Sequence, residues 1–157
     1  MKVIFLDIDG VLNVIGQGYD EFGQIFHKHL EENLKKIVDS TGAKIVISST
    51  WRYAGLKKMQ KMWTKRNLAG EVIDITDDLG IQGQRIKRGF EIQKWLQEHP
   101  EVIQYVILDD DTDMLNHQIG NFVRTSNNTN HFDCIDIGYG LTTICAEKAI
   151  RILNKLL

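Results

Sequence analysis

Short runs of apolar residues recur along the chain, and most of them are followed by a stretch in which apolar residues keep helical spacing. Apolar runs without polar alternation are typical of parallel strands that are buried on both faces of a sheet. We therefore expect strands at residues 3–6, 44–48, 72–75, 105–108 and 121–125.

Four helices are expected between and after these strands, because apolar residues there recur with the period of an α-helix. Two of the helices end at glycines, Gly42 and Gly70, and Pro100 follows the third. We place the helices at about 30–41, 56–69, 90–96 and 144–157. Strands that alternate with helices predict an α/β fold, in which a three-layer, Rossmann-like parallel sheet has helices on both faces.

Two regions lack a periodic pattern. Residues 13–29 are irregular and rich in glycine, and we expect them to form a mobile flap. Residues 77–87 are expected to form a loop. The chain of 157 residues is long enough for one domain with a substantial core, and it contains no repeat or low-complexity linker. The prediction is a single domain over residues 1–157.

Composition narrows the function classes. The formal net charge of −2 argues against a protein that coats nucleic acid but permits a local basic patch. No apolar run is long enough to span a membrane, and the N-terminal run is interrupted by Asp7 and Asp9, unlike a signal peptide. The two cysteines, Cys134 and Cys145, favour free thiols in a reducing cytoplasm and are too few for a metal cluster.

Polar residues follow three of the expected strands. Asp7 and Asp9 follow the first, 48–50 close the second, and 109–113 follow the fourth. Right-handed crossovers bring the carboxyl ends of parallel strands to one edge of the sheet, where open α/β sheets bind ligands. The three segments are therefore expected to meet in one cleft.

Two acidic clusters at one sheet edge would repel each other unless a cation lies between them. Carboxylate oxygens with open positions suit Mg²⁺. An EF-hand calcium loop is excluded, because the twelfth residue counted from Asp7 is Gly18 and not glutamate. A solvated acidic turn is the alternative for 109–113, but here the acids end an apolar strand.

The segment ISSTWR and the basic pair before the third helix supply groups that could bind phosphate. Ser49 could donate a hydrogen bond to a phosphate oxygen, and Arg52 could meet it as a fork. Ser49 or Thr50 could instead cap a helix, which is compatible with an anion site. Lys87 and Arg88 are either surface charges or the source of the cation that offsets a phosphate.

In chain order, DIDGVLN, ISST, KRG and ILDDD resemble the four motifs of the haloacid dehalogenase-like (HAD) phosphohydrolases. The longer strings ISSTWR, RGFEIQKWL and YVILDDDTDM resemble the HAD domain of Swiss army knife RNA repair proteins. Within this family, the short spans between the motifs imply a capless member, covered only by the flap at about 13–29.

The resemblance implies a role for each acid. Asp7 would be the nucleophile that forms an aspartyl-phosphate, and Asp9 the general acid and base. Mg²⁺ would be bound by Asp7, by the backbone carbonyl of Asp9 and by Asp110, with Asp109 as the alternative ligand. Asp109 and Asp113 would otherwise be supporting acids.

The resemblance also assigns the groups around the phosphate. Ser49 would hold the transferring phosphoryl group, with Thr50 as a second candidate. Arg88 would neutralise the aspartyl-phosphate, with Lys87 as the alternative.

The expected function is therefore a Mg²⁺-dependent phosphomonoesterase, with nucleotide or polynucleotide phosphate ends as candidate substrates. The alternative is a non-catalytic module that binds phosphate or a partner, but such a module would not need Asp9. The substrate question depends on a stretch without acids between Gly55 and Gly70. Its basic residues are either a solvated helix face or a track for a nucleic-acid backbone: Lys57, Lys58, Lys61, Lys65 and Arg66.

Aromatic residues leave a further choice open. Trp51 could stack on a base or belong to the core, and Tyr19, Phe22 and Phe26 could close over a substrate or pin the flap. The sequence makes no prediction about the oligomeric state.

Overall fold

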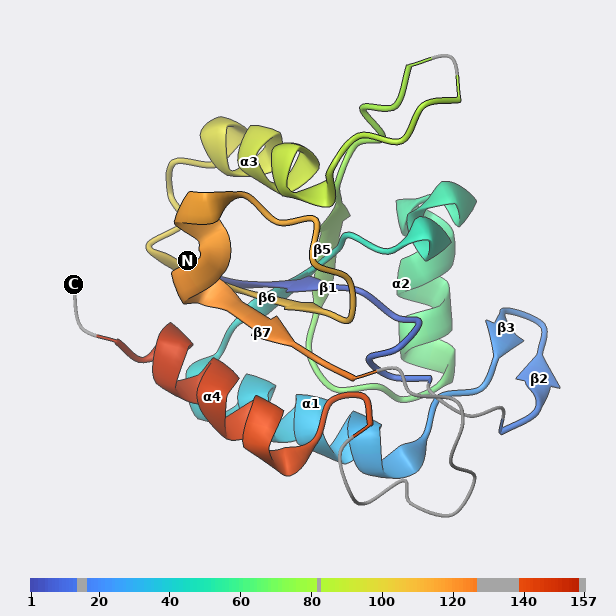
Figure 1. Cartoon of the computed structure of the whole chain (residues 1–157). Helices are drawn as coiled ribbons and strands as arrows, with labels where there is room; N and C mark the ends of the chain where they lie inside the picture. Colours follow the sequence, from blue (N-terminus) through green and yellow to red (C-terminus); the bar gives the residue numbers. More distant parts are fainter. Residues whose placement is uncertain (14–16, 82, 127–138, 156–157) are drawn as a thin grey trace.

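The computed structural model describes residues 1–13, 17–81, 83–126 and 139–155, and its centre is a five-stranded parallel sheet (Figure 1). The strand order is β5-β4-β1-β6-β7. Their bounds are Lys2–Leu6 for β1, Lys44–Ile47 for β4, Val72–Ile75 for β5, Gln104–Asp109 for β6 and Phe122–Arg124 for β7. The predicted α/β fold is confirmed, and β1 lies in the middle of the sheet.

Helices cover both faces of this sheet (Figure 1). α1 (Lys28–Thr41), α2 (Leu56–Lys65) and α4 (Thr143–Leu153) pack in one apolar cluster with Ile4 and Leu6 of β1. α3 (Arg88–Glu98) packs on the other face, where it contributes to a cluster with Val3 and Phe5. Because successive side chains of β1 enter opposite cores, the strand is continuously apolar in sequence.

Several element boundaries differ from the sequence-based expectation, and α2 ends at Lys65 instead of at 69. α4 begins after Thr142 and ends at Leu153, short of Leu157, and Ile144 at its start is 76% exposed instead of buried. Hydroxyl capping by Thr142 fixes this start. β7 is shorter than 121–125, because the short helix η2 (Asn116–Asn121) occupies its first expected position. A second short helix, η1 (Thr50–Ala54), begins after Ser49, one of the two residues considered as a helix cap.

The flap contains a small antiparallel hairpin, in which β2 (Tyr19–Asp20) pairs with β3 (Gly23–Gln24). Figure 1 shows this hairpin beside α2. Among the described residues there is no insertion large enough to form a cap, as the resemblance implied. Cys134 lies outside the described residues, and so do residues 14–16 of the expected flap.

Candidate active site

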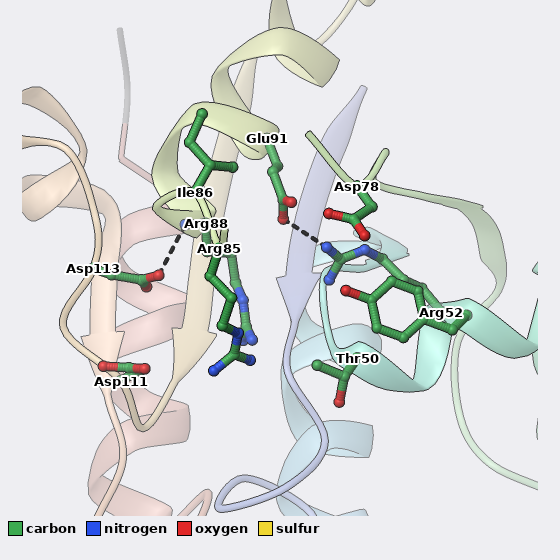
Figure 2. A pocket seen from close by; sticks show the side chains of 10 residues that line it. Thr50, Arg52, Asp78, Arg85, Ile86, Arg88, Glu91, Asp111 and Asp113 are labelled. Carbon is green, nitrogen blue, oxygen red and sulfur yellow. Dashed lines mark hydrogen bonds and ion pairs between the residues drawn. The ribbon is translucent and has the colours of Figure 1, made fainter. Parts of the chain in front are cut away.

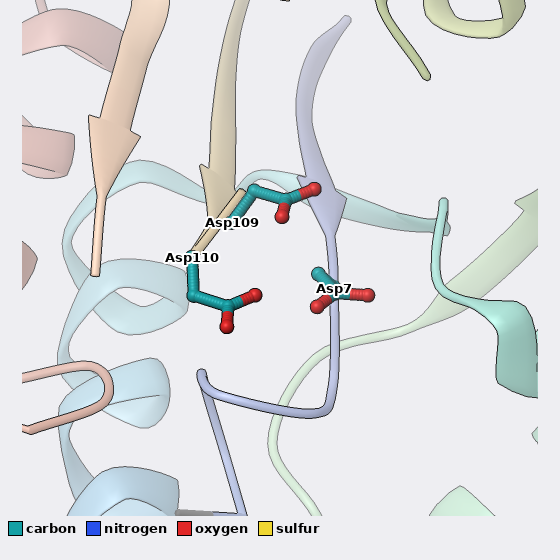
Figure 3. A group of neighbouring side chains, drawn as sticks. All are labelled: Asp7, Asp109 and Asp110. Carbon is teal, nitrogen blue, oxygen red and sulfur yellow. The ribbon is translucent and has the colours of Figure 1, made fainter. Parts of the chain in front are cut away.

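The carboxyl ends of β1 and β6 bring three carboxylates together (Figure 3). Asp7, Asp109 and Asp110 each offer an oxygen that lies within 4.8 Å of the others. The sheet itself fixes this approach, because Leu6 is in register with Leu108 and the amide of Asp7 donates to the Leu108 carbonyl at 2.9 Å. The predicted meeting of 7–9 with 109–113 is therefore observed.

The loop after β1 depends on Gly10 for its path. Gly10 has a φ of 78°, and a Cβ added at this position would lie 2.4 Å from the carboxyl group of Asp110. No side chain fits there, and L-residues rarely adopt such a φ. Glycine in DIDG thus allows the loop to approach Asp110 closely.

Asp109 and Asp110 differ in their surroundings. Asp109 is fully buried; its Oδ2 lies 2.5 Å from Arg88 Nη1, and its Oδ1 accepts a hydrogen bond from the Asp111 amide at 2.9 Å. Asp110 is half-buried, and no hydrogen bond to its carboxylate is found in the described part of the chain. Asp110 therefore offers the freer oxygens.

Arg88 forms ion pairs with acids at the ends of two strands, Asp7 after β1 and Asp109 in β6. Its Nη1 lies 2.9 Å from Asp7 Oδ1, and its backbone amide donates to Asp113 Oδ2 at 2.9 Å. Burial opposes its charge, but Asp109 and Asp7 raise the pKa of Arg88 above its ordinary value. Lys87, the alternative cation, is exposed and precedes α3. The structure thus brings Arg88, and not Lys87, to Asp7.

The buried acids are held against their own repulsion. Burial raises the pKa of Asp7 to about 6, and the charge of Asp110 adds to the rise, whereas Arg88 and a hydrogen bond with Ser49 oppose it. Burial and the charge of Asp7 likewise raise the pKa of Asp109 to about 7. A cation between these groups would relieve the cost of their charges.

Ser49 takes the capping role that the sequence allowed, and its role in binding phosphate stays a prediction. Its hydroxyl, fully buried, accepts a hydrogen bond from the Trp51 amide at 3.3 Å as the N-cap of η1. The same hydroxyl lowers the pKa of Asp7, against the effect of burial. Thr50 follows it, half-buried, and lines the neighbouring cleft.

The guanidinium of Arg52 is committed within the protein, which differs from the phosphate fork expected from the sequence. Its Nη1 donates to the Ser48 carbonyl at 2.7 Å and its Nη2 to Glu91 Oε2 at 2.8 Å, and both side chains are 5% exposed. Figure 2 shows this ion pair between η1 and α3. Burial raises the pKa of Glu91, and the charge of Arg52 is the main opposing effect. The positive charge of Arg52 thus stabilises the negative charge of the buried carboxylate.

Asp9 lies on the solvent side of the same loop. Its Oδ1 accepts a hydrogen bond from Asn13 Nδ2 at 2.8 Å and its Oδ2 from Trp51 Nε1 at 3.0 Å. Neither donor was predicted. Asn13 belongs to the DIDGVLN string, but Trp51 is 42 positions away in sequence, and only the tertiary structure brings its indole to Asp9.

A cleft of about 70 Å³ opens beside Arg88, between η1, the loop before α3, and the segment after β6 (Figure 2). Tyr53 lines the cleft and is 64% exposed, with the Arg52 guanidinium 5.2 Å from the ring centre. Arg85 and Ile86 line the opposite side. The cleft therefore combines an exposed aromatic ring with basic and acidic side chains, since Asp78, Asp111 and Asp113 line it together with Arg85.

The family model for the HAD domain in Swiss Army Knife RNA repair proteins matches residues 3–130. The chain belongs to this family. The match includes all four motifs described above, and this membership together with the acidic cluster indicates a phosphatase-like function. No curated protein and no solved structure matches the chain. None of the described helices is both long and apolar enough to cross a membrane.

Proposed function

We propose that this HAD domain is a Mg²⁺-dependent phosphomonoesterase that acts through an aspartyl-phosphate on Asp7. One observation carries the proposal: the carboxylate of Asp7 lies between the guanidinium of Arg88, the hydroxyl of Ser49 and the carboxylate of Asp110. A nucleophile for phosphoryl transfer needs this combination of a cation, a hydrogen-bond donor and a metal ligand.

The acidic cluster fits Mg²⁺ by its chemistry. Its ligands would be hard carboxylate oxygens, and the closeness of Gly10 to Asp110 would allow the backbone carbonyl of Asp9 to contribute. We assign Asp7 and Asp110 as carboxylate ligands. Asp109 is the supporting acid, because its two oxygens already bind Arg88 and the Asp111 amide. When bound, Mg²⁺ would neutralise the carboxylates and draw a phosphate oxygen to the site.

The chain's own residues would carry the proton and phosphoryl transfers. The Asp7 carboxylate attacks phosphorus, the bond to the leaving oxygen breaks, and Asp9 donates a proton to that oxygen. Asp9 then accepts a proton from water, the resulting hydroxide attacks phosphorus, and the bond between Asp7 and phosphorus breaks. Ser49 and Arg88 stabilise the charge on the phosphoryl oxygens in both steps.

The proposed substrate is a phosphate at the end of a nucleic acid. The cleft beside Arg88 supports this choice, since Tyr53 offers a ring for base stacking and Arg85 a cation for a second phosphate. From Tyr53 the chain continues directly into α2, whose exposed lysines would extend the path: Lys57, Lys58 and Lys61. The family description, which names RNA repair proteins, points the same way.

Two of the basic residues considered for this path are paired with acidic residues of the flap, and we leave them out of the proposed path. Lys65 Nζ lies 2.5 Å from Glu21, and Arg66 binds Asp20 through Nε at 2.9 Å and Nη2 at 2.7 Å. Both basic residues therefore hold the β2–β3 hairpin. The path is limited to Lys57, Lys58 and Lys61.

The test compares an oligonucleotide that bears a terminal phosphate with the corresponding mononucleotide. We expect a higher kcat/KM for the oligonucleotide, and we expect salt to reduce that advantage because counterion release contributes to binding. Lys57→Glu with Lys58→Glu should lower kcat/KM for the oligonucleotide about tenfold at low salt. Lys36→Glu with Lys148→Glu is the matched control, since both lysines are exposed on α1 and α4 and the charge change is the same.

Equal rates on the two substrates at low salt would refute the polymer-end proposal. Binding of phosphate ends without turnover of them or of p-nitrophenyl phosphate would favour the non-catalytic module instead. An equal loss in the Lys36 and Lys148 control would show that net charge, and not a path across α2, sets the preference.

A further inference from the structure

The carboxylate of Asp9 is exposed, yet both of its oxygens are held. Asn13 binds Oδ1 from within the same loop, and Trp51 binds Oδ2 from η1. We propose that Trp51 is a positioning residue for Asp9 and that it transmits the position of the β2–β3 hairpin to this carboxylate. The inference rests on the proposed function, in which Asp9 is the general acid and base.

The indole of Trp51 is itself fixed by the flap. A Cβ added at Gly23 of β3 would lie only 3.3 Å from the Trp51 ring, so the hairpin backbone passes close to the indole. The ring of Phe26, which is buried, has its centre 5.6 Å from the Trp51 ring. The guanidinium carbon of Arg66 lies 5.8 Å from the centre of the same ring. Trp51 therefore packs against the flap while its N–H reaches Asp9.

Ion pairs fix the hairpin in turn. Arg66, whose side chain is only 8% exposed, holds Asp20 with two hydrogen bonds, and Lys65 pairs with Glu21. A chain of contacts thus runs from α2 through the hairpin and the Trp51 ring to Asp9. Its links are the ion pairs to Asp20 and Glu21, the close approach of the Gly23 backbone to the Trp51 ring, and the hydrogen bond from Trp51 to Asp9.

This arrangement matters for proton transfer because an exposed aspartate otherwise samples several rotamers. A general acid must lie within hydrogen-bond reach of the leaving oxygen, and fixing its geometry beforehand reduces the entropy lost in the reaction. An indole N–H can only donate, so Trp51 fixes Oδ2 as a hydrogen-bond acceptor. The Asn13 amide fixes Oδ1 from the other side, so the two donors together set the orientation of the carboxylate.

Substrates with different leaving groups distinguish the positioning role from a purely structural role of Trp51. A purely structural role would change kcat/KM for both substrates by the same factor. p-Nitrophenolate leaves with little help from an acid, whereas the alkoxide of a nucleoside 5′-phosphate needs a proton. Trp51→Phe keeps an aromatic ring against the flap and removes the N–H. We expect kcat/KM for the nucleoside 5′-phosphate to fall about tenfold relative to that for p-nitrophenyl phosphate.

Trp63→Phe is the matched control. Its indole belongs to the same apolar cluster and donates to the Ala69 carbonyl at 2.9 Å, away from Asp9. We expect the ratio of the two kcat/KM values to be unchanged in this variant. In an Asp9→Asn background, Trp51→Phe should cause no further change in the ratio, because both substitutions act on one group.

Asp20→Asn tests whether the hairpin affects Asp9 through Trp51. The substitution is exposed, weakens the contact to Arg66 and poses little risk to folding. We expect the ratio of kcat/KM for the nucleoside 5′-phosphate to kcat/KM for p-nitrophenyl phosphate to fall about threefold. Glu71→Gln, which breaks the exposed ion pair with Lys44, is its control. An unchanged ratio in Trp51→Phe would overturn the positioning role, and an unchanged ratio in Asp20→Asn would remove the hairpin from it.

Failure of the proposed function would look different. Absence of turnover in the unmodified protein, or full activity of Asp7→Asn, would refute the phosphatase itself. If the enzyme is active and Trp51→Phe leaves the ratio of the two kcat/KM values unchanged, only the positioning role of Trp51 is refuted.

Discussion

The two carboxylates of DIDG lie in opposite environments, although only Ile8 separates them in sequence. Asp7 is 5% exposed and is held by a cation, Arg88, among other acids. Asp9 is exposed and is held by two neutral donors, Asn13 and Trp51. The buried group suits a nucleophile and metal ligand with a fixed position, and the exposed group suits proton exchange with a leaving group and with water.

The largest expected effect is that of Asp7→Asn on turnover. An amide is a poor nucleophile and a poor Mg²⁺ ligand, so we expect phosphatase activity to fall to background in steady-state assays. The fold should survive, because the substitution removes the negative charge of Asp7, which burial and the charge of Asp110 disfavour. An unchanged or raised Tm would support this, and full activity of the purified variant would contradict the covalent mechanism.

Removal of the metal should abolish activity through the site of Asp7 and Asp110. We expect EDTA to abolish activity and Mg²⁺ to restore it, while Ca²⁺ should support much less because it tolerates more ligands and looser geometry. Mg²⁺ should also raise the Tm of the unmodified protein, and this rise should vanish in Asp110→Asn. Normal turnover by metal-free enzyme would show that the acidic cluster has another purpose.

Asp9→Asn should cost less than Asp7→Asn. We expect kcat/KM for a nucleoside 5′-phosphate to fall by about 10²–10⁴-fold, the usual contribution of a general acid, with a smaller loss for p-nitrophenyl phosphate. The Tm should stay unchanged, since the side chain is exposed. A loss equal to that of Asp7→Asn on both substrates would mean that the two carboxylates do not have separate roles.

Arg52→Met should affect stability more than chemistry. It leaves Glu91 buried without its partner, and we expect the free energy of unfolding in urea to fall by about 3–5 kcal/mol. Glu91→Gln, which keeps a hydrogen-bond acceptor for Arg52, should cost less. If Arg52→Lys remains folded and raises KM for phosphate esters more than about tenfold, then Arg52 contacts the substrate after all.

The sequence by itself determined the sheet, its helices and the edge at which the acids gather. Alternating apolar strands and periodic helices imply a parallel α/β sheet, and that topology forces the ends of β1 and β6 together. The residues of DIDG and ILDDD could therefore be located in advance. Gly10 also shows why such a local string is informative, since the backbone at this one position tolerates only glycine.

Only the tertiary structure decided which of two adjacent residues contacts a group distant in sequence. Arg88 reaches Asp7 whereas Lys87 is exposed, and Asp109 pairs with Arg88 whereas Asp110 is half-buried beside Gly10, because burial and direction differ at each step of the chain. Arg52, Lys65 and Arg66 looked available for phosphate, whereas each pairs with an acid distant in sequence. The contact of Trp51 with Asp9 is of the same kind, since pairing between side chains 42 positions apart leaves no periodic or local signal.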